Sequence, residues 1–156
     1  TVIIAAIVLG PVDGAIIGGI WGLLTWVRAF VAPSSPLAPL VFVNPLVSVV
    51  PRIMIGILAG YTFILMCRLV KAKYIAAVSA AIVGTLTNTG LVLGFIYLFY
   101  RTPAVAQTYG VNVNHLLIAL ETVMATNGLA ELILAIIIVP MVALPVLEVR
   151  RRLEVN

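Results

Sequence analysis

Polar side chains with ligand-binding chemistry interrupt the apolar runs of this chain at a few positions. The first group follows Asn44, where Ser48 and Arg52 are four residues apart and so share one face of a helix. A guanidinium group in an apolar run needs an anion or several hydrogen-bond acceptors to offset its desolvation. Two interpretations of Arg52 have about equal weight. It either pairs structurally, with Glu131 or with a carbonyl freed by Pro51, or it contacts an anionic ligand.

Two further groups have helical spacing. Thr85, Asn88 and Thr89 stand at i, i+3 and i+4, and Asn127 and Glu131 are one turn apart. Threonine hydroxyls often bond back to their own helix, so Asn88 is the stronger candidate of the first set. Glu131 is either ionised and paired, with Arg52 as its natural partner, or neutral and able to donate a hydrogen bond.

The other polar and aromatic residues carry weaker signals. His115 and Glu121 are expected to be solvated more often than functional. Aromatic side chains near the ends of apolar runs are typical of the interfacial belt of membrane proteins. The aromatic residues of this kind are Trp21, Trp26, Tyr97, Tyr100 and Tyr109.

Motifs of catalysis and of metal binding are absent from the sequence. It contains no HExxH pair, no GxSxG elbow, no Walker motif and no cluster of metal-ligand residues. The one cysteine, Cys67, lies in an apolar run, and no internal disulfide can form. We therefore expect neither an enzyme, a metal site nor a cofactor, and energy for any transport must come from elsewhere.

Composition determines the fold class. Hydrophobic residues make up 63% of the 156 residues and charged residues 9%, whereas a soluble domain carries about 25% charged residues. The surface must therefore face lipid, and the long continuous apolar runs predict an all-α integral membrane protein. The net charge of +4 does not indicate nucleic-acid binding, because Lys71, Lys73 and Arg150 to Arg152 stand at the ends of apolar runs.

Breaker residues divide the chain into one partial and four complete spans of a single transmembrane domain. Residues 1–9 are too few to cross a hydrocarbon core that needs about 20 residues. Two outer loops cover residues 32–45 and 101–123, and residues 114–125 are a candidate for a short interfacial helix. The complete spans are expected at about 12–31, 46–70, 74–100 and 124–147.

The positive charges predict the orientation. The cluster of Arg68, Lys71 and Lys73 and the cluster of Arg150 to Arg152 are separated by two crossings, so both can lie in the cytoplasm. Thr1 is then at or near the outer side, at the broken start of a helix. We expect a further span before it and a six-helix protein with both termini in the cytoplasm.

Small residues form two stripes at four-residue spacing, which let helix backbones approach closely in lipid. One stripe is Gly14, Gly18 and Gly22, and the other is Ala76, Ala80 and Gly84. Contact with a neighbouring helix of the same bundle is the commoner use of such stripes, and contact with a separate protein is the alternative.

The polar groups are expected at similar depths in the membrane. Under this topology Asn44, Arg52, Asn88, Asn127 and Glu131 lie in the outer half or at the midplane, while the cytoplasmic half of the spans is nearly free of polar side chains. The asymmetry predicts a pocket that opens outward rather than a channel. The proline-rich loop 32–45 could cover it as a lid.

Several of these motifs together resemble one membrane-protein family. The carriers of the resemblance are Leu9-Gly10-Pro11, the stretch from Asn44 to Arg52, Thr87-Asn88-Thr89 and the stretch from Asn127 to Glu131. They are similar to the substrate-binding S components of energy-coupling factor (ECF) transporters, and most similar to the pantothenate-specific members. The resemblance covers nearly the whole chain.

The resemblance implies a six-helix S-component bundle whose first helix is absent from this chain. It implies a bacterial cell-membrane protein that captures a vitamin from outside and docks to a membrane T component driven by two cytoplasmic ATPases. The S component would then topple in the membrane to carry its ligand inward. The alanine and glycine stripe of Ala76, Ala80 and Gly84 would contribute to the docking face.

Pantothenate, a carboxylate with hydroxyls and an amide, suits the polar groups, since Arg52 would bind the carboxylate. A flavin or thiamine pocket should show more aromatic residues than the span around Asn88, which has none. The alternatives are an S component for another vitamin (folate, riboflavin or a pyridoxine-type ligand) and a scaffold subunit that transports nothing. The predicted substrate-binding residues are Asn44, Ser48, Arg52, Thr85, Asn88, Thr89, Asn127 and Glu131.

Overall fold

The computed structural model describes residues 1–33 and 38–155, and within these ranges every regular element is a helix. The four segments long and apolar enough to cross a membrane are Pro11–Val31, Pro45–Val70, Lys73–Phe99 and Val113–Leu153. The predicted all-α membrane fold is confirmed. The helices are α1 (Val2–Leu9), α2 (Pro11–Val31), α3 (Ala38–Val41), α4 (Pro45–Ser48), α5 (Val50–Val70), α6 (Lys73–Phe99), α7 (Pro103–Thr108), α8 (Leu116–Val123) and α9 (Leu129–Val155), with a 3-10 turn η1 (Val113–His115) and a π-helical turn η2 (Met124–Gly128).

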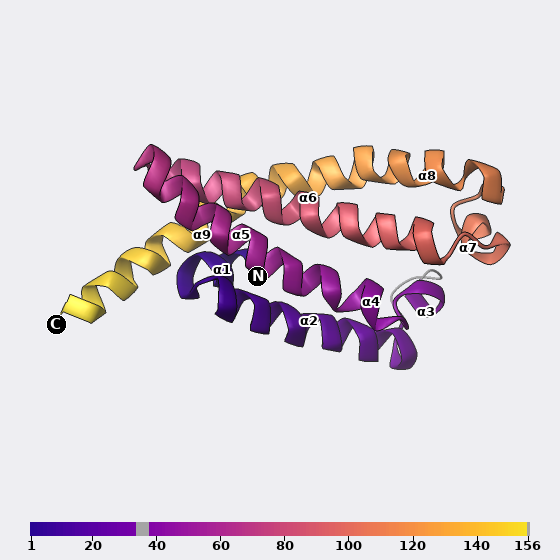
Figure 1. Ribbon diagram of the computed structural model, residues 1–156, viewed down its shortest axis with the longest axis horizontal. Helices are drawn as coiled ribbons and strands as arrows, with labels where there is room; N and C mark the ends of the chain where they lie inside the picture. The colour runs from indigo at the N-terminus through magenta and orange to yellow at the C-terminus, as the bar shows by residue number, and fades with distance from the viewer. Residues whose placement is uncertain (34–37, 156) are drawn as a thin grey trace.

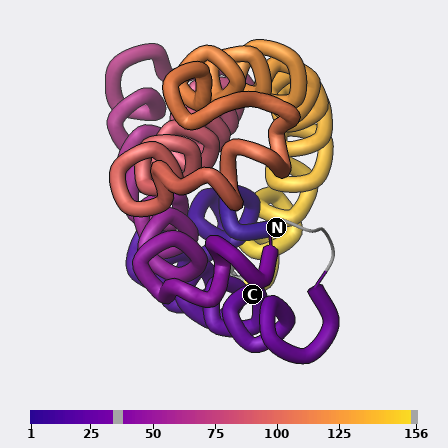
Figure 2. The backbone as a smooth tube through the Cα atoms, turned by 90° about the vertical axis from the view of Figure 1, so that its right-hand side faces the viewer, coloured from indigo at the N-terminus to yellow at the C-terminus, as the bar shows by residue number. Residues whose placement is uncertain are grey.

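The long helices form an elongated bundle (Figure 1). Helix α5 packs between α2 and α6, and α6 packs against α9. The short α1 contacts α2, α5, α6 and α9, and the end-on view shows it in the middle of them (Figure 2). The described helices are therefore packed around the eight residues of α1.

Turn residues fix the short connections between the helices. Gly10 has φ of 115°, a value that glycine adopts at little cost, and Pro11 then opens α2 at its first position. Lys71 ends α5 in the left-handed conformation, with φ of 54°. The side chain of Thr102 accepts a hydrogen bond from the Val105 backbone N–H and so caps α7.

The glycine stripe of α2 joins α2 to α5 within the bundle. A Cβ atom on Gly18 would lie 2.1 Å from the Arg52 carbonyl oxygen, and one on Gly22 would lie 2.7 Å from Val49 Cα. A Cβ atom on Gly56 would in turn lie 2.2 Å from the Gly14 carbonyl carbon. The two backbones are thus in direct contact, which only glycine allows.

The second stripe is also internal, which corrects its assignment to a docking face. Ala76 and Ala80 are 0% exposed, and Gly84 is buried against Ile3 and Ala59. These residues belong to a core of small side chains shared by α1, α5, α6 and α9. They are therefore not available for contact with another protein.

Residues 101–123 contain more helix than the expected loop, because α7, η1 and α8 fall inside them. The segment expected as a separate interfacial helix continues through η2 into α9. Pro140 and Pro145 each remove one backbone hydrogen bond from α9, which turns away from the direction of α8 towards its C-terminal end (Figure 1). Residues 34–37 of the expected lid lie outside the described residues.

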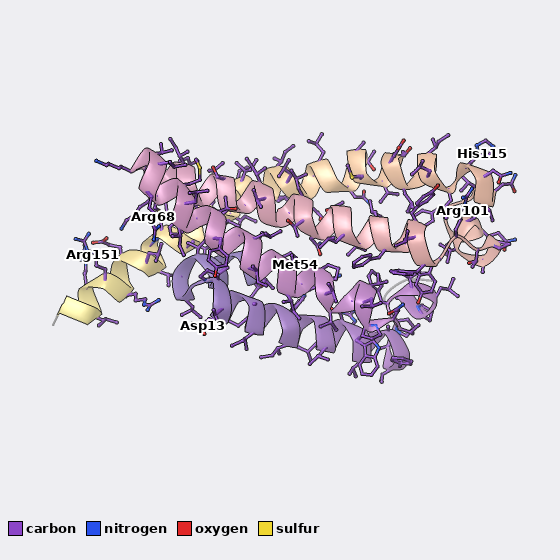
Figure 3. The ribbon with its side chains drawn as sticks, in the orientation of Figure 1. Asp13, Met54, Arg68, Arg101, His115 and Arg151 are labelled. Carbon is purple, nitrogen blue, oxygen red and sulfur yellow. The ribbon has the colours of Figure 1, made fainter. Side chains whose placement is uncertain are left out.

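Charged residues mark the two ends of the bundle. Arg68 and Arg151 lie at one end of the bundle, and Arg101 and His115 lie at the other (Figure 3). We call the first the basic end, defined by Arg68, Lys71, Lys73 and Arg150 to Arg152, and the second the α7 end.

Candidate functional site

Two cavities lie side by side between α5, α6 and α9, and the residues Arg52, Asn88 and Glu131 line both of them. The α1 cavity, of about 220 Å³, is also lined by residues of α1 and α2. The α8 cavity, of about 210 Å³, extends along α6 to η2. Together they reach the range of roughly 300–1,000 Å³ that is usual for ligand pockets.

Arg52 is held by a backbone carbonyl and an aromatic ring. Pro51 has no N–H, so the Val47 carbonyl lacks its usual helical partner, and Arg52 Nη1 donates to it at 3.1 Å. The Arg52 guanidinium carbon lies 5.6 Å from the centre of the Phe42 ring. No ion pair of 4.0 Å or less joins Arg52 to Glu131, although both line the cavities. The freed carbonyl, rather than the carboxylate, is thus its direct structural partner.

Arg52 keeps donors for a ligand. A guanidinium group has five N–H donors, and Val47 is the only protein acceptor that the structure gives it within residues 1–33 and 38–155. Arg52 lines both cavities, and among the described residues no carboxylate lies within 4.0 Å of it. The guanidinium is therefore positioned by the protein but not neutralised by direct contact.

The start of α5 is positioned by local capping and by α2. Asn44 Oδ1 accepts from the Leu46 N–H at 2.9 Å, and Ser48 Oγ donates to the Asn44 carbonyl at 3.1 Å. Trp26 Nε1 donates to the Val43 carbonyl at 2.8 Å and so ties the end of α2 to the same turn. Neither Asn44 nor Ser48 lines the two cavities, and both have structural hydrogen bonds.

Helix α6 contributes oxygen atoms without partners. Asn88 Oδ1 and Thr89 Oγ1 are buried and have no hydrogen-bond partner. Thr85, which is 7% exposed, lines the α1 cavity with Asn88, while Thr89 lines the α8 cavity. Buried polar atoms nearly always have a partner, so these orphaned oxygens indicate a missing one.

The last helix supplies an amide and a carboxylate. Asn127 lies in the π-helical turn η2, and Glu131 lies one turn later in α9. Asn127 lines only the α8 cavity, whereas Glu131 lines both cavities. Gly128 lets this turn approach α6, because a Cβ atom there would lie 3.3 Å from the Thr89 methyl group.

Sequence patterns missed two aromatic residues of the site. Trp21 lines the α1 cavity from α2, and Phe42 lines the α8 cavity from the turn before α4. A signal for Trp21 did exist, because it stands three residues after Gly18, on the side of α2 that faces α5. Phe42 lies outside any periodic segment, and no pattern marks it.

The core towards the basic end is apolar. Its buried residues are alanine, isoleucine, valine and phenylalanine side chains from α1, α5, α6 and α9. The described residues contain no cluster of histidine, cysteine or acidic side chains that could hold a metal ion. The arrangement can therefore bind a small polar anion, with a cation, orphaned oxygens and two aromatic rings around it.

Comparison with known proteins identifies the family. Residues 1–143 match the sequence model of the family described as ECF transporter, substrate-specific component. The chain is 33% identical over 149 residues to the pantothenic acid transporter PanT of Lactococcus lactis subsp. cremoris, covering 88% of this chain and 69% of that protein. It is 49% identical over 63 residues to the pantothenate transporter PanT of Leuconostoc mesenteroides, covering 40% of this chain and 30% of that protein. The chain belongs to the family of substrate-specific (S) components of ECF transporters.

Proposed function

We propose that this S component binds pantothenate in the paired cavities around Arg52 and delivers it across a bacterial cell membrane. A membrane T component and two cytoplasmic ATPases would supply the motion and the energy. The names of the two relatives support the choice of vitamin, and the family supports the division of labour.

One observation carries the proposal. Arg52 lines the same cavity of about 210 Å³ as Asn88 and Thr89, whose buried oxygens Oδ1 and Oγ1 have no protein partner. A carboxylate would bind the guanidinium, and a hydroxyl or amide N–H would donate to the Asn88 oxygen. Asn127 and Glu131 would complete the polar contacts from η2 and α9.

The span around Asn88 has no aromatic residue, but the cavities do have aromatic residues, so this argument for pantothenate is weakened. Trp21 and Phe42 reach the cavities from other elements, and they could pack against a planar ring. Another vitamin is therefore the second candidate, and a ligand panel must include flavin and pyridoxine compounds beside pantothenate.

The uneven distribution of polar groups supports movement of the whole subunit rather than conduction through it. Towards the basic end the described core is apolar, and a polar ligand that passed between these helices would lose its hydrogen-bond partners. A ligand bound near Arg52 would therefore have to cross the membrane with its protein, as the toppling mechanism of the family requires.

The full-length protein tests this function through its carboxylate contact. We expect tight binding of pantothenate and weak binding of pantothenol, which has an alcohol in place of the carboxylate. Arg52→Ala should weaken pantothenate binding by at least about 30-fold, because a buried, hydrogen-bonded charge pair loses one member. Isothermal titration calorimetry in detergent measures both affinities.

Arg101→Ala is the matched control. Arg101 also stacks on an aromatic ring, with its guanidinium carbon 5.6 Å from the centre of Tyr97, but it lines neither cavity. The Arg101→Ala variant should bind pantothenate with the same affinity as the unmodified protein. Equal affinities of the Arg52→Ala and Arg101→Ala variants would show that the ligand binds elsewhere.

A further inference from the structure

A third cavity lies at the basic end, apart from the proposed vitamin site. It has a volume of about 210 Å³ and shares no lining residue with the cavities around Arg52. Its walls come from α5, α6 and the C-terminal part of α9. The lining residues are Phe63, Cys67, Lys73, Leu147, Arg150 and Arg151.

The described residues that line this cavity carry charge of one sign. Three cationic side chains line it, and none of its lining residues is acidic. Glu148, which precedes the two cavity arginines on α9, is 3.4 Å from Arg152 instead. Within the described part of the chain, no carboxylate lies within 4.0 Å of Lys73 or Arg151. Like charges gathered from two helices repel each other, so an anion between them would stabilise the arrangement.

Arg150 is anchored differently from the other two cations. Its guanidinium Nη1 donates to the Val8 carbonyl at the end of α1. This contact ties the tail of α9 to the turn between α1 and α2. Lys73 at the start of α6 and Arg151 on α9 then remain as the cations that an incoming anion would bind.

We propose that this cavity binds the phosphate group of an anionic membrane lipid. Basic pockets between membrane helices suit anionic headgroups, because the phosphate meets the cations while the apolar part of the lipid meets the wall. Phe63 and Leu147 supply such a wall beside the charges. A soluble phosphate would leave these two side chains unused, which is why a lipid fits the cavity better.

The proposal makes a quantitative prediction for full-length protein in detergent. Native mass spectrometry should show retained phosphatidylglycerol and much less retained phosphatidylcholine with the same acyl chains. The double substitution Lys73→Gln with Arg151→Gln should weaken phosphatidylglycerol binding roughly 25-fold, at about fivefold for each charge removed. The single substitutions should each show about a fivefold loss, which covers the case in which the double variant fails to fold.

A charge-matched pair at the same end provides the control. Lys71 and Arg68 are exposed, as Lys73 and Arg151 are, but they line no part of the cavity. The combination of Lys71→Gln with Arg68→Gln removes the same charge and should keep most of the affinity. Equal losses in the two double variants would overturn the proposal, since the lipid would then respond to net charge alone.

A second arm distinguishes the sources of the phosphate. Inorganic phosphate is added at millimolar concentration, and the melting temperature and the retained lipid are both measured. If phosphate displaces phosphatidylglycerol from the unmodified protein but not from the Lys73→Gln variant, the same site binds a soluble phosphate. Binding of neither ligand by the unmodified protein would overturn the proposal, whatever the outcome at the vitamin site.

Discussion

The amide oxygen of Asn88 in α6 is buried and has no hydrogen-bond partner, so a substitution at this residue can separate binding from structure. Removal of an unsatisfied buried acceptor relieves its desolvation, which costs about 1–3 kcal/mol. Asn88→Leu should therefore raise the melting temperature of the ligand-free protein while it weakens ligand binding. A residue that only ties helices together would show the opposite change in stability.

Ser48→Ala is the companion variant. Ser48 is 0% exposed and donates to the Asn44 carbonyl, away from both cavities. The loss of this bond should destabilise the protein by about 1 kcal/mol and leave the affinity for the ligand unchanged. Thermal unfolding and titration of the two variants side by side give both readouts. If the affinity falls as much in Ser48→Ala as in Asn88→Leu, Ser48 takes part in ligand binding.

At the scale of residues, the signal that sequence reasoning can use is a polar side chain at membrane depth. Arg52, Asn88 and Glu131 stand out among apolar neighbours, and the structure brings them to the same two cavities. The same reasoning cannot separate a cap from a ligand-binding group, because Asn44 has the residue type for both roles. Phe42 lies at the cavity because of the conformation of its turn, which cannot be predicted from the sequence.

The contact between α2 and α5 depends on one glycine more than on its neighbour. Gly18→Ala would place a methyl group 2.1 Å from the Arg52 carbonyl, and a backbone atom cannot move aside without moving α5. We expect a destabilisation of about 1–3 kcal/mol and weaker ligand binding, because Arg52 shifts with its helix. Unfolding in denaturant and titration with pantothenate measure the two effects.

Gly19→Ala controls for the change of residue type in the same helix. A Cβ atom at Gly19 would lie 3.6 Å from Ile53 Cγ1, which is ordinary van der Waals contact. Since alanine favours helix over glycine by about 1 kcal/mol, this variant should be as stable as the parent or more so. A destabilisation as large as that of Gly18→Ala would mean that the backbone contact is not what holds α2 to α5.

At the scale of elements, strong breakers define the helices that the sequence predicts well. Gly10 with Pro11 and the Lys71 turn separate long apolar runs, so α2, α5 and α6 begin and end close to the expected residues. Between residues 101 and 123 the apolar periodicity is weak and α7 is only six residues long. The π-helical turn η2 has no sequence pattern of its own, because an extra residue in a turn is accommodated by packing against α6.

At the scale of the whole molecule, the two ends have different chemistry, and we propose a different partner for each. The polar cavities around Arg52 and the basic cavity around Lys73 are separated by a core of small apolar side chains. Tight packing of that core keeps the long helices together as one body. A subunit that carries its ligand by moving needs such rigidity, since a ligand held by α5, α6 and α9 would be lost if these helices separated.

We propose an orientation of this body in the membrane from its charges, and thiol labelling can test it. Six of the nine Lys and Arg residues define the basic end, which the positive-inside rule places in the cytoplasm. In a Cys67→Ser background of the full-length protein, Gln107→Cys at the α7 end should react with a membrane-impermeant maleimide in intact cells. Lys71→Cys at the basic end should react only after the cells are made permeable. The reverse pattern would place the polar cavities towards the cytoplasm, and capture of a vitamin from outside would then require the opposite movement of the protein.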